Sequence, residues 1–326
     1  MHPAPSVILF TTLMGVGQGL FLALYTAQLY AAMRILSWQA SPAFCALGAF
    51  LAVAFLLAGT GASFLHLGRP ERSWRSAAMW RTSWLSREVI LLPATTGLMV
   101  VYGALHALGW DSTLFTVAGF IAVDLTLVVG LLAAIAVFGL FLSTAMIYAS
   151  QAFLQEWHSP LTVCNFVFLG CASGFTLATA FASGLANSGD AFYTHWAVIL
   201  TAAAFITRGS SLILNGRRRR RSTLESAIGV RHPQIRQIAQ GSMGGSFNTR
   251  EFFHHQTPTR VVATRWAFLL LVFPLPIALL IAGEASDAAG PAVAAFAVQY
   301  LGLLAERWSF FADARHPQNL YYQAIA

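Results

Sequence analysis

The feature that most constrains this chain is a succession of long apolar runs joined by short polar connections. A helix rises 1.5 Å per residue, so about 20 apolar residues cross the hydrocarbon core of a bilayer. The runs of that length cover residues 7–32, 44–65, 84–108, 125–149, 161–182, 196–214, 261–282 and 291–311. We therefore expect an all-α fold, a polytopic integral membrane bundle of eight transmembrane helices.

The composition agrees with this fold class. Only 10% of the residues are charged and 57% are hydrophobic, whereas an ordinary soluble domain has roughly 25% charged residues. We expect residues 1–326 to form a single transmembrane domain, within which residues 215–260 form a cytoplasmic polar loop. No room remains for a separate soluble domain.

The basic residues, all 19 of them arginine, are distributed unevenly along the chain. Eight spans put both termini on one side, where 18 arginines fall, and leave Arg34 alone on the other side. Basic residues collect in cytoplasmic loops of membrane proteins. We predict that the termini, and the connection from residue 66 to residue 88, face the cytoplasm.

The run GRRRRR at residues 216–221 favours topological anchoring and attraction to anionic membrane lipid. Docking on an acidic partner surface is the alternative, and no nucleic-acid partner is expected. The later stretch GSMGGSFNTREFFHH could order against a partner subunit or remain a mobile loop.

The fourth apolar run, residues 114–149, is longer than one perpendicular span requires. Either its helix is tilted, or its first part lies outside the membrane core. We favour a span at residues 125–149, which leaves Asp124 near an interface.

Redox metal groups are not expected in this chain. Cys45, Cys164 and Cys171 fall in apolar runs and form no C-x-x-C pair, which argues against an iron–sulfur cluster or a disulfide framework. A b-type haem requires paired histidines at matching depth, and none of the nine histidines lies in the middle of a predicted span. We predict no haem, no metal site and no residue that is catalytic by itself.

Ionisable residues gather between the second and third runs, in SFLHLGRPERSWRSAAMWRTSWLSRE at residues 63–88. Such residues at the edge of a span are costly and suggest a functional site. His66 ends the second run, and Glu88 opens the third beside Arg87. These two groups could hydrogen-bond a quinone and exchange protons with water. Equally, His66 could cap one helix end while Glu88 favourably occupies the first turn of the next helix.

Two further groups of residues belong near the same face. Tyr148 and Trp157, with Gln151 and His158, could wall a quinone pocket, or they could be part of an interfacial aromatic belt. Glu306 and Arg307 are adjacent on the eighth run, so we expect each to pair elsewhere, with Arg208 or Arg87 as candidate partners.

The chain resembles a known family at several motifs. LHLGRP followed by S-x-E at a helix start, TAMIYAS at residues 144–150 and LLAERWSFFADARH at residues 303–316 are similar to dimethyl sulfoxide reductase anchor subunits. These bacterial inner-membrane anchors belong to complex iron–sulfur molybdoenzymes. The resemblance implies a quinone, ubiquinone or menaquinone, bound near the face that docks a ferredoxin-like iron–sulfur subunit, which in turn contacts a molybdopterin catalytic subunit. It assigns quinone binding to His66 and Glu88, and we add Arg87, Tyr148 and Trp157 as candidates.

The predicted orientation favours one group of anchors within this family. A cytoplasmic docking face, the ERW-x-FFA-x-ARH tail and the FNTREFFHH loop resemble the anchors of cytoplasm-facing sulfite dehydrogenases, which pass electrons from sulfite to quinone. The alternative within the family is an anchor of a dimethyl sulfoxide or polysulfide reductase that oxidises quinol. The alternative from another class is a membrane transporter, which would show broken helices and internal repeats around a site at the midplane.

Overall fold

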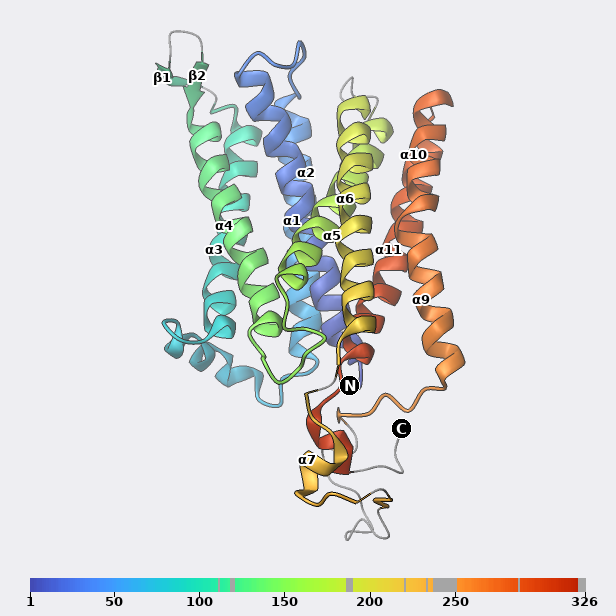
Figure 1. Ribbon diagram of the computed structural model, residues 1–326. Helices are drawn as coiled ribbons and strands as arrows, with labels where there is room; N and C mark the ends of the chain where they lie inside the picture. The colour runs from blue at the N-terminus through green and yellow to red at the C-terminus, as the bar shows by residue number, and fades with distance from the viewer. Residues whose placement is uncertain are drawn as a thin grey trace.

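The structure is a computed structural model that describes residues 1–110, 112–117, 121–185, 190–219, 221–232, 234–236, 251–286 and 288–321. Within these residues, eight helical segments are long and apolar enough to cross a membrane, as the apolar runs predict. They stand side by side in one bundle (Figure 1). Their bounds are α1 Pro5–Ala32, α2 Pro42–Phe64, α3 Trp84–Leu108, α4 Leu125–Ala149, α5 Pro160–Gly184, α6 Asp190–Arg217, the pair α9 Pro258–Val272 and α10 Pro274–Ser286, and α11 Ala289–Asp313.

Shorter elements connect the spans. The 3₁₀ segment η1, Pro70–Met79, joins α2 to α3, and the strands β1, Thr113–Val117, and β2, Ile121–Asp124, form an antiparallel hairpin before α4. The helix α7, Leu224–Ile228, lies in the polar loop, and η2, Pro317–Tyr321, follows α11. The loop itself is slightly shorter than expected, because α6 continues to Arg217 and α9 already begins at Pro258. Arg220 of the GRRRRR run and residues 247–250 of FNTREFFHH lie outside the described residues.

Local sequence signals explain where several spans begin. The side chains of Ser41 and Ser159 accept hydrogen bonds from backbone amides at the starts of α2 and α5, and proline occupies the first helical position in each case. Proline suits that position because its missing N–H would have no partner inside the helix. Asp124 caps α4 in the same way, accepting from Leu127 N at 2.7 Å.

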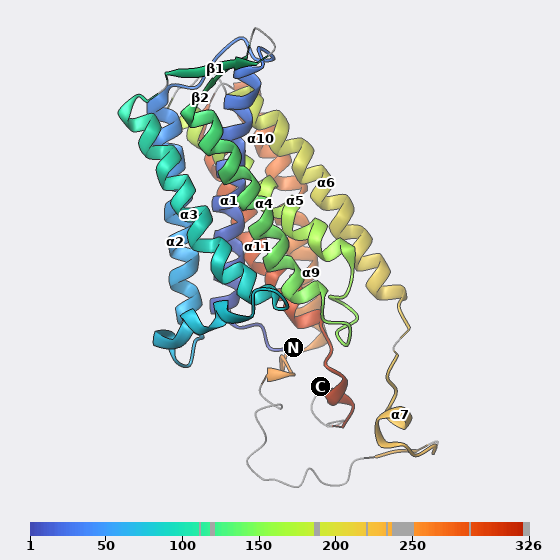
Figure 2. The ribbon, with the colours of Figure 1, turned by 90° about the vertical axis from the view of Figure 1, so that its left-hand side faces the viewer.

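The hairpin distinguishes between the two interpretations of the long fourth run, a tilted helix or a first part outside the membrane. All of β1 is exposed, and α4 begins at Leu125, so the part of the run before Asp124 lies outside the span as predicted. Figure 2 shows the hairpin at the end of the bundle away from the N-terminus. The extended conformation was not predicted, because an apolar run alone does not distinguish a strand from a helix.

The two ends of the bundle differ in charge. Met1, η1 and the end of α11 lie at one end, which we call the arginine-rich end (Figure 1). The opposite end carries the hairpin and Arg34. There, Glu284 contacts the exposed His195 at 3.1 Å.

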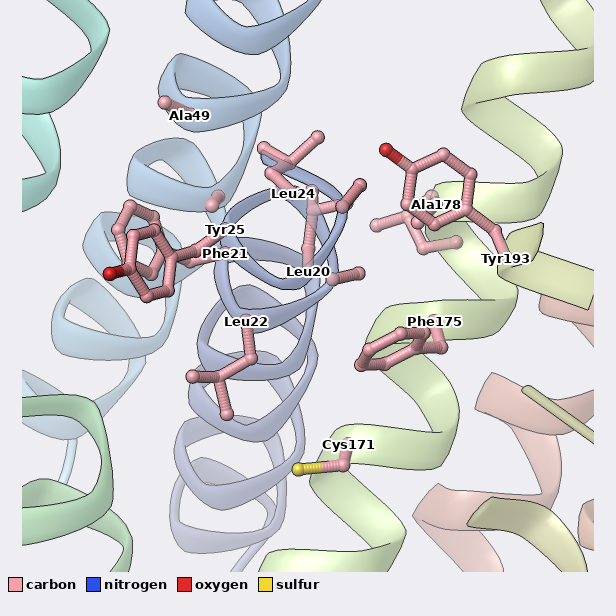
Figure 3. Close-up of a cluster of buried hydrophobic side chains, with 14 of the residues drawn as sticks. Leu20, Phe21, Leu22, Leu24, Tyr25, Ala49, Cys171, Phe175, Ala178 and Tyr193 are labelled. Carbon is pink, nitrogen blue, oxygen red and sulfur yellow. The ribbon is translucent and has the colours of Figure 1, made fainter. Parts of the chain in front are cut away.

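The centre of the bundle is built on α1, which packs against α2, α4, α5 and α11. Leu20 and Leu24 of α1 face Phe175 and Ala178 of α5 in the buried cluster of Figure 3. These two helices approach so closely that a Cβ atom added to Gly174 would lie 2.0 Å from the carbonyl carbon of Gly19.

Gly15 and Gly19 on α1, and Gly170 and Gly174 on α5, repeat at a spacing of four residues on their helices. We call this contact the glycine seam. Small residues at that spacing bring two backbones together in lipid, where packing and not the exclusion of water drives helix association.

The seventh span is interrupted, which the apolar runs do not predict. It consists of α9 and α10, which meet at Phe273. Pro276 has no N–H for the carbonyl oxygen of Val272 four residues earlier. The buried Gln299 of α11 donates Nε2 to that oxygen at 3.2 Å and lies 3.2 Å from Thr201 Oγ1 of α6. A neighbouring side chain therefore satisfies the freed backbone group, as membrane interiors require.

Candidate functional site

Glu88 lies inside the bundle near the arginine-rich end. The helix α3 begins at Trp84, where the Ser83 side chain accepts from Ser86 N. This start turns Glu88 toward α4, and only 4% of the residue is exposed. Thr144 Oγ1 of α4 donates to Glu88 Oε1 at 2.5 Å. The first turns of α3 thus hold a carboxylate against a hydroxyl group and away from lipid.

His66 lies two residues beyond the end of α2 and is exposed. Partial burial lowers its pKa below the usual value, which favours the neutral ring. Within the described residues no hydrogen bond or ion pair joins His66 to Glu88. The structure therefore places both residues at the arginine-rich end, one on the surface and one inside, without bringing them into direct contact.

Arg87 turns away from Glu88. Its Nε donates to the carbonyl oxygen of Trp80 at 3.0 Å, and its Nη2 donates to that of Arg81 at 2.7 Å. The guanidinium also lies over the Trp84 ring, 4.1 Å from its centroid. Arg87 thus fastens the end of the η1 connection to the first turn of α3. The expectation that Arg87 could partner Glu306 or Arg307 is wrong, because two of its nitrogens bond to this loop and Arg87 forms no ion pair within the described residues.

Tyr148 and Trp157 belong to a buried aromatic cluster. Their ring centroids are 5.1 Å apart, and both rings contact Phe166 of α5 or Phe310 of α11. Trp157 is 5% exposed, and its Nε1 donates to the carbonyl oxygen of Phe310 at 2.9 Å. Trp157 thus packs between helices and does not face lipid as a belt residue would.

The other two residues considered for the pocket wall use polar atoms in the same turn of chain. Gln151 Nε2 donates to the carbonyl oxygen of Ile147 at 2.9 Å. His158 Nδ1 lies 2.7 Å from the carbonyl oxygen of Ala149. Both side chains therefore stabilise the end of α4 and the connection that follows it.

Three charged residues form a cluster, which we call the ion cluster, in the half of the bundle toward the arginine-rich end. Arg208 Nε of α6 lies 2.7 Å from Glu306 Oε1 of α11, which confirms Arg208 as the partner of Glu306. Arg307 Nε lies 3.5 Å from the other oxygen, Oε2. The expectation that Arg307 pairs elsewhere is wrong: the single carboxylate lies between two guanidinium groups, one of them on the adjacent residue.

A cavity of about 20 Å³ lies where α1, α4, α5 and α11 meet. Its polar lining includes Thr144, Arg307, Gln18 and Ser173, and the glycine seam contributes Gly15 and Gly170. Sequence reasoning missed this cavity. One signal was present, since the polar residues Thr11 and Gln18 lie seven positions apart, on one face of an otherwise apolar helix.

Metal-binding geometry is not found in the described part of the chain, where no group of three or more His, Cys, Asp or Glu side chains could hold an ion. Cys45, Cys164 and Cys171 are free thiols, and the first and third are buried. The polar groups described at this end of the bundle include one buried carboxylate, one surface imidazole and the buried ion cluster.

Comparisons with known proteins place the chain as a whole among membrane anchor subunits. The family model described as DMSO reductase anchor subunit (DmsC) matches residues 1–309. The chain is also 55% identical to a sulfite dehydrogenase subunit of Allochromatium vinosum, over 326 residues that cover 100% of both chains.

Proposed function

Because this chain belongs to the DMSO reductase anchor subunit family, we propose that it anchors a molybdoenzyme complex in the bacterial inner membrane and passes electrons between an iron–sulfur subunit and quinone. The partners are a ferredoxin-like iron–sulfur subunit and a molybdopterin catalytic subunit. The quinone is ubiquinone or menaquinone, bound near the arginine-rich end. Full-length membership of an anchor family supports this function over that of a transporter. The interrupted seventh span does not favour a transporter, because Gln299 satisfies the freed carbonyl there.

Oxidation of sulfite on the cytoplasmic side is the reaction that we propose for the complex. The full-length relative from Allochromatium vinosum, which is named as part of a sulfite dehydrogenase, supports this substrate. The arginine count supports a cytoplasmic docking face, since basic residues collect on that side. Electrons from sulfite then reduce quinone. An anchor that serves a reductase and oxidises quinol is the alternative, and it would favour the opposite direction of electron flow.

The single observation that carries the proposal is the environment of Glu88. Two carboxylates are buried among the described residues, Glu88 and Glu306. Glu306 contacts two arginines, whereas Glu88 has a hydroxyl group as its hydrogen-bond partner and forms no ion pair in the described part of the chain. A carboxyl group without a cation can gain and lose a proton at modest cost, as quinone reduction requires.

His66 suits the role of exchanging protons with water. It is exposed at the end of α2, and its lowered pKa leaves a neutral ring near pH 7, able to accept a proton. Arg87 contributes indirectly by fixing the turn that carries Glu88. Tyr148, which lies within electrostatic range of Glu88, and Trp157, which packs against Tyr148, would form an aromatic wall of the quinone pocket. Protons and electrons then arrive from the same side, so turnover moves no net charge across the membrane.

The test uses the intact complex purified with variants Glu88→Gln and His66→Ala. Each should slow electron exchange with a soluble quinone by about a hundredfold or more, since a positioned proton-transfer group typically contributes about 10²–10⁴-fold, while the partner's activity with an artificial dye stays unchanged. Glu71→Gln is the matched control, since Glu71 is exposed on η1 and its only ion pair among the described residues is with the exposed Arg72. Unchanged quinone kinetics in both site variants would refute the proposed roles.

A further inference from the structure

The ion cluster carries one positive charge in excess. Arg208 and Arg307 contribute two positive charges, and Glu306 contributes one negative charge. Their side chains are 3%, 4% and 0% exposed. An uncompensated charge in such surroundings is strongly unfavourable even after relaxation. The rings of Phe166 and Phe310 face Arg307, and a further polar group beside it would stabilise the excess charge.

Arg307 is the member of the cluster that faces the cavity. Its guanidinium carbon lies 3.9 Å from the centroid of the Phe166 ring, and both residues line the cavity. Its Nη1 is buried and has no hydrogen-bond partner among the described residues. This donor is thus buried beside an open space and without an acceptor.

The size and lining of the cavity suit a water molecule. A cavity needs about 10–15 Å³ to hold a water and two to four polar partners around it, and this one has about 20 Å³. Arg307 can donate, whereas Thr144 and Gln18 can accept.

Thr144 connects the cavity to the carboxylate of the proposed quinone site. Its hydroxyl group has one proton, which it donates to Glu88, and two lone pairs, which remain free to accept. A water that accepts from Arg307 can donate to Thr144. Arg307 then donates to the water, the water donates to Thr144, and Thr144 donates to Glu88. Hydrogen bonds that all run in this direction favour the ionised carboxylate.

We propose that this cavity binds one ordered water, which links Arg307 to Thr144 and thereby lets Arg307 set how readily Glu88 releases its proton. Arg307 is a positioning residue that acts through another group, and it does not touch the quinone. The inference rests on the proposed function of Glu88 and extends it to a residue on a different helix.

Other charged or titratable groups lie on α3, or on or next to the elements packed against it. They are Tyr148 on α4, which lies within electrostatic range of both Glu88 and Arg307, His66 after α2, Glu71, Arg72 and Arg75 on η1, and Arg87 on α3 itself. The η1 residues are not buried, so water screens them. Arg87 is directed toward the loop. Arg307, in contrast, is buried and lines the same cavity as Thr144, the hydrogen-bond partner of Glu88.

The experiment measures how the quinone-linked rate of the complex depends on pH. If Glu88 must be protonated to donate, the rate falls as pH rises through a midpoint. Arg307→Met removes a charge that favours the ionised form, so the midpoint should move up by about 0.5 to 1 pH unit. Arg307→Lys keeps the positive charge, so the midpoint of this variant should stay close to that of the unaltered complex. Arg265→Met, which removes an arginine paired with Asp313 at 3.0 Å, is the control and should leave the midpoint unchanged.

A double-variant cycle tests whether Arg307 acts through Glu88. Adding Arg307→Met to Glu88→Gln should change the pH profile no further. A midpoint unchanged by Arg307→Met, or an equal shift in the Glu88→Gln background, would overturn the inference. If Arg307→Met fails to assemble, Thr144→Val breaks the same link without removing a charge, and an unchanged midpoint there also overturns it. If Glu88→Gln alone leaves the quinone kinetics unaltered, the proposed role of Glu88 is refuted. This outcome differs from an unchanged midpoint in Arg307→Met, which refutes only the role of Arg307.

Discussion

Two buried contacts hold the bundle together by opposite means. At the glycine seam, α1 and α5 touch backbone to backbone, so that Gly19 and Gly174 leave no space for a side chain. At the ion cluster, α6 and α11 are linked by the long side chains of Arg208 and Glu306. The stability of the glycine seam depends on steric fit alone. The stability of the ion cluster also depends on the charges of nearby groups, which change when those groups gain or lose protons or electrons. The cavity lies where the two meet, since both the seam and Arg307 line it.

The largest effect is expected from breaking the seam. Gly174→Leu would place a Cβ atom 2.0 Å from the backbone of Gly19, and neither helix can yield locally. Overpacking usually costs about 1–3 kcal/mol and more when backbone must move, so we expect loss of the folded bundle in detergent, measured by size-exclusion chromatography. Gly97→Leu is the control, because nothing lies within 4 Å of a Cβ there. A normally folded Gly174→Leu variant would show that the seam is not close-packed.

The ion cluster offers a graded comparison. Glu306→Gln leaves two buried arginines without a counter-charge, and breaking a buried pair this way costs about 3–5 kcal/mol. Arg208→Met leaves the neutral pair Glu306 and Arg307, so it should cost clearly less. Thermal unfolding of the purified protein measures both, with the exposed Glu284→Gln as control. Equal losses in the two variants would contradict the view that excess positive charge dominates here.

A smaller effect is expected at the interrupted span, where a neutral polar contact joins α11 to α9. Gln299→Leu removes the donor to the Val272 carbonyl oxygen. Leaving that oxygen unpaired costs about 1–3 kcal/mol, which should lower the unfolding temperature by a few degrees. Pro276→Ala restores a backbone N–H at the same place, so the double variant should lose less than Gln299→Leu alone. Additive losses would mean that Gln299 acts elsewhere.

Most of the fold could be predicted from apolar periodicity and length. All eight spans appear where the runs predict them, with ends shifted by a few residues at most of them, because hydropathy measures how long a segment is apolar. The break at Phe273 and the hairpin before Leu125 were not predicted. Pro274 and Pro276 were visible signals of the first, whereas Leu114 to Val117 read equally as helix or strand.

The site was predictable only in part. Charge placed near a span identified Glu88, Arg208 and Glu306 as unusual residues, and the Arg208 contact with Glu306 was among the expected pairs. The partner of Glu88 and the cavity depend on which faces of four helices meet. No pattern within one helix contains that information, so the Thr144 contact and the position of Arg307 beside the cavity emerged only from the structure.

The two hydrogen bonds of Arg87 couple the segment that follows η1 to the start of α3. They attach the connection at Trp80 and Arg81 rigidly to the turn of α3 that also carries Glu88. A movement of Trp80 or Arg81 would therefore be transmitted to the helical turn that carries the Glu88 carboxylate, one residue from Arg87.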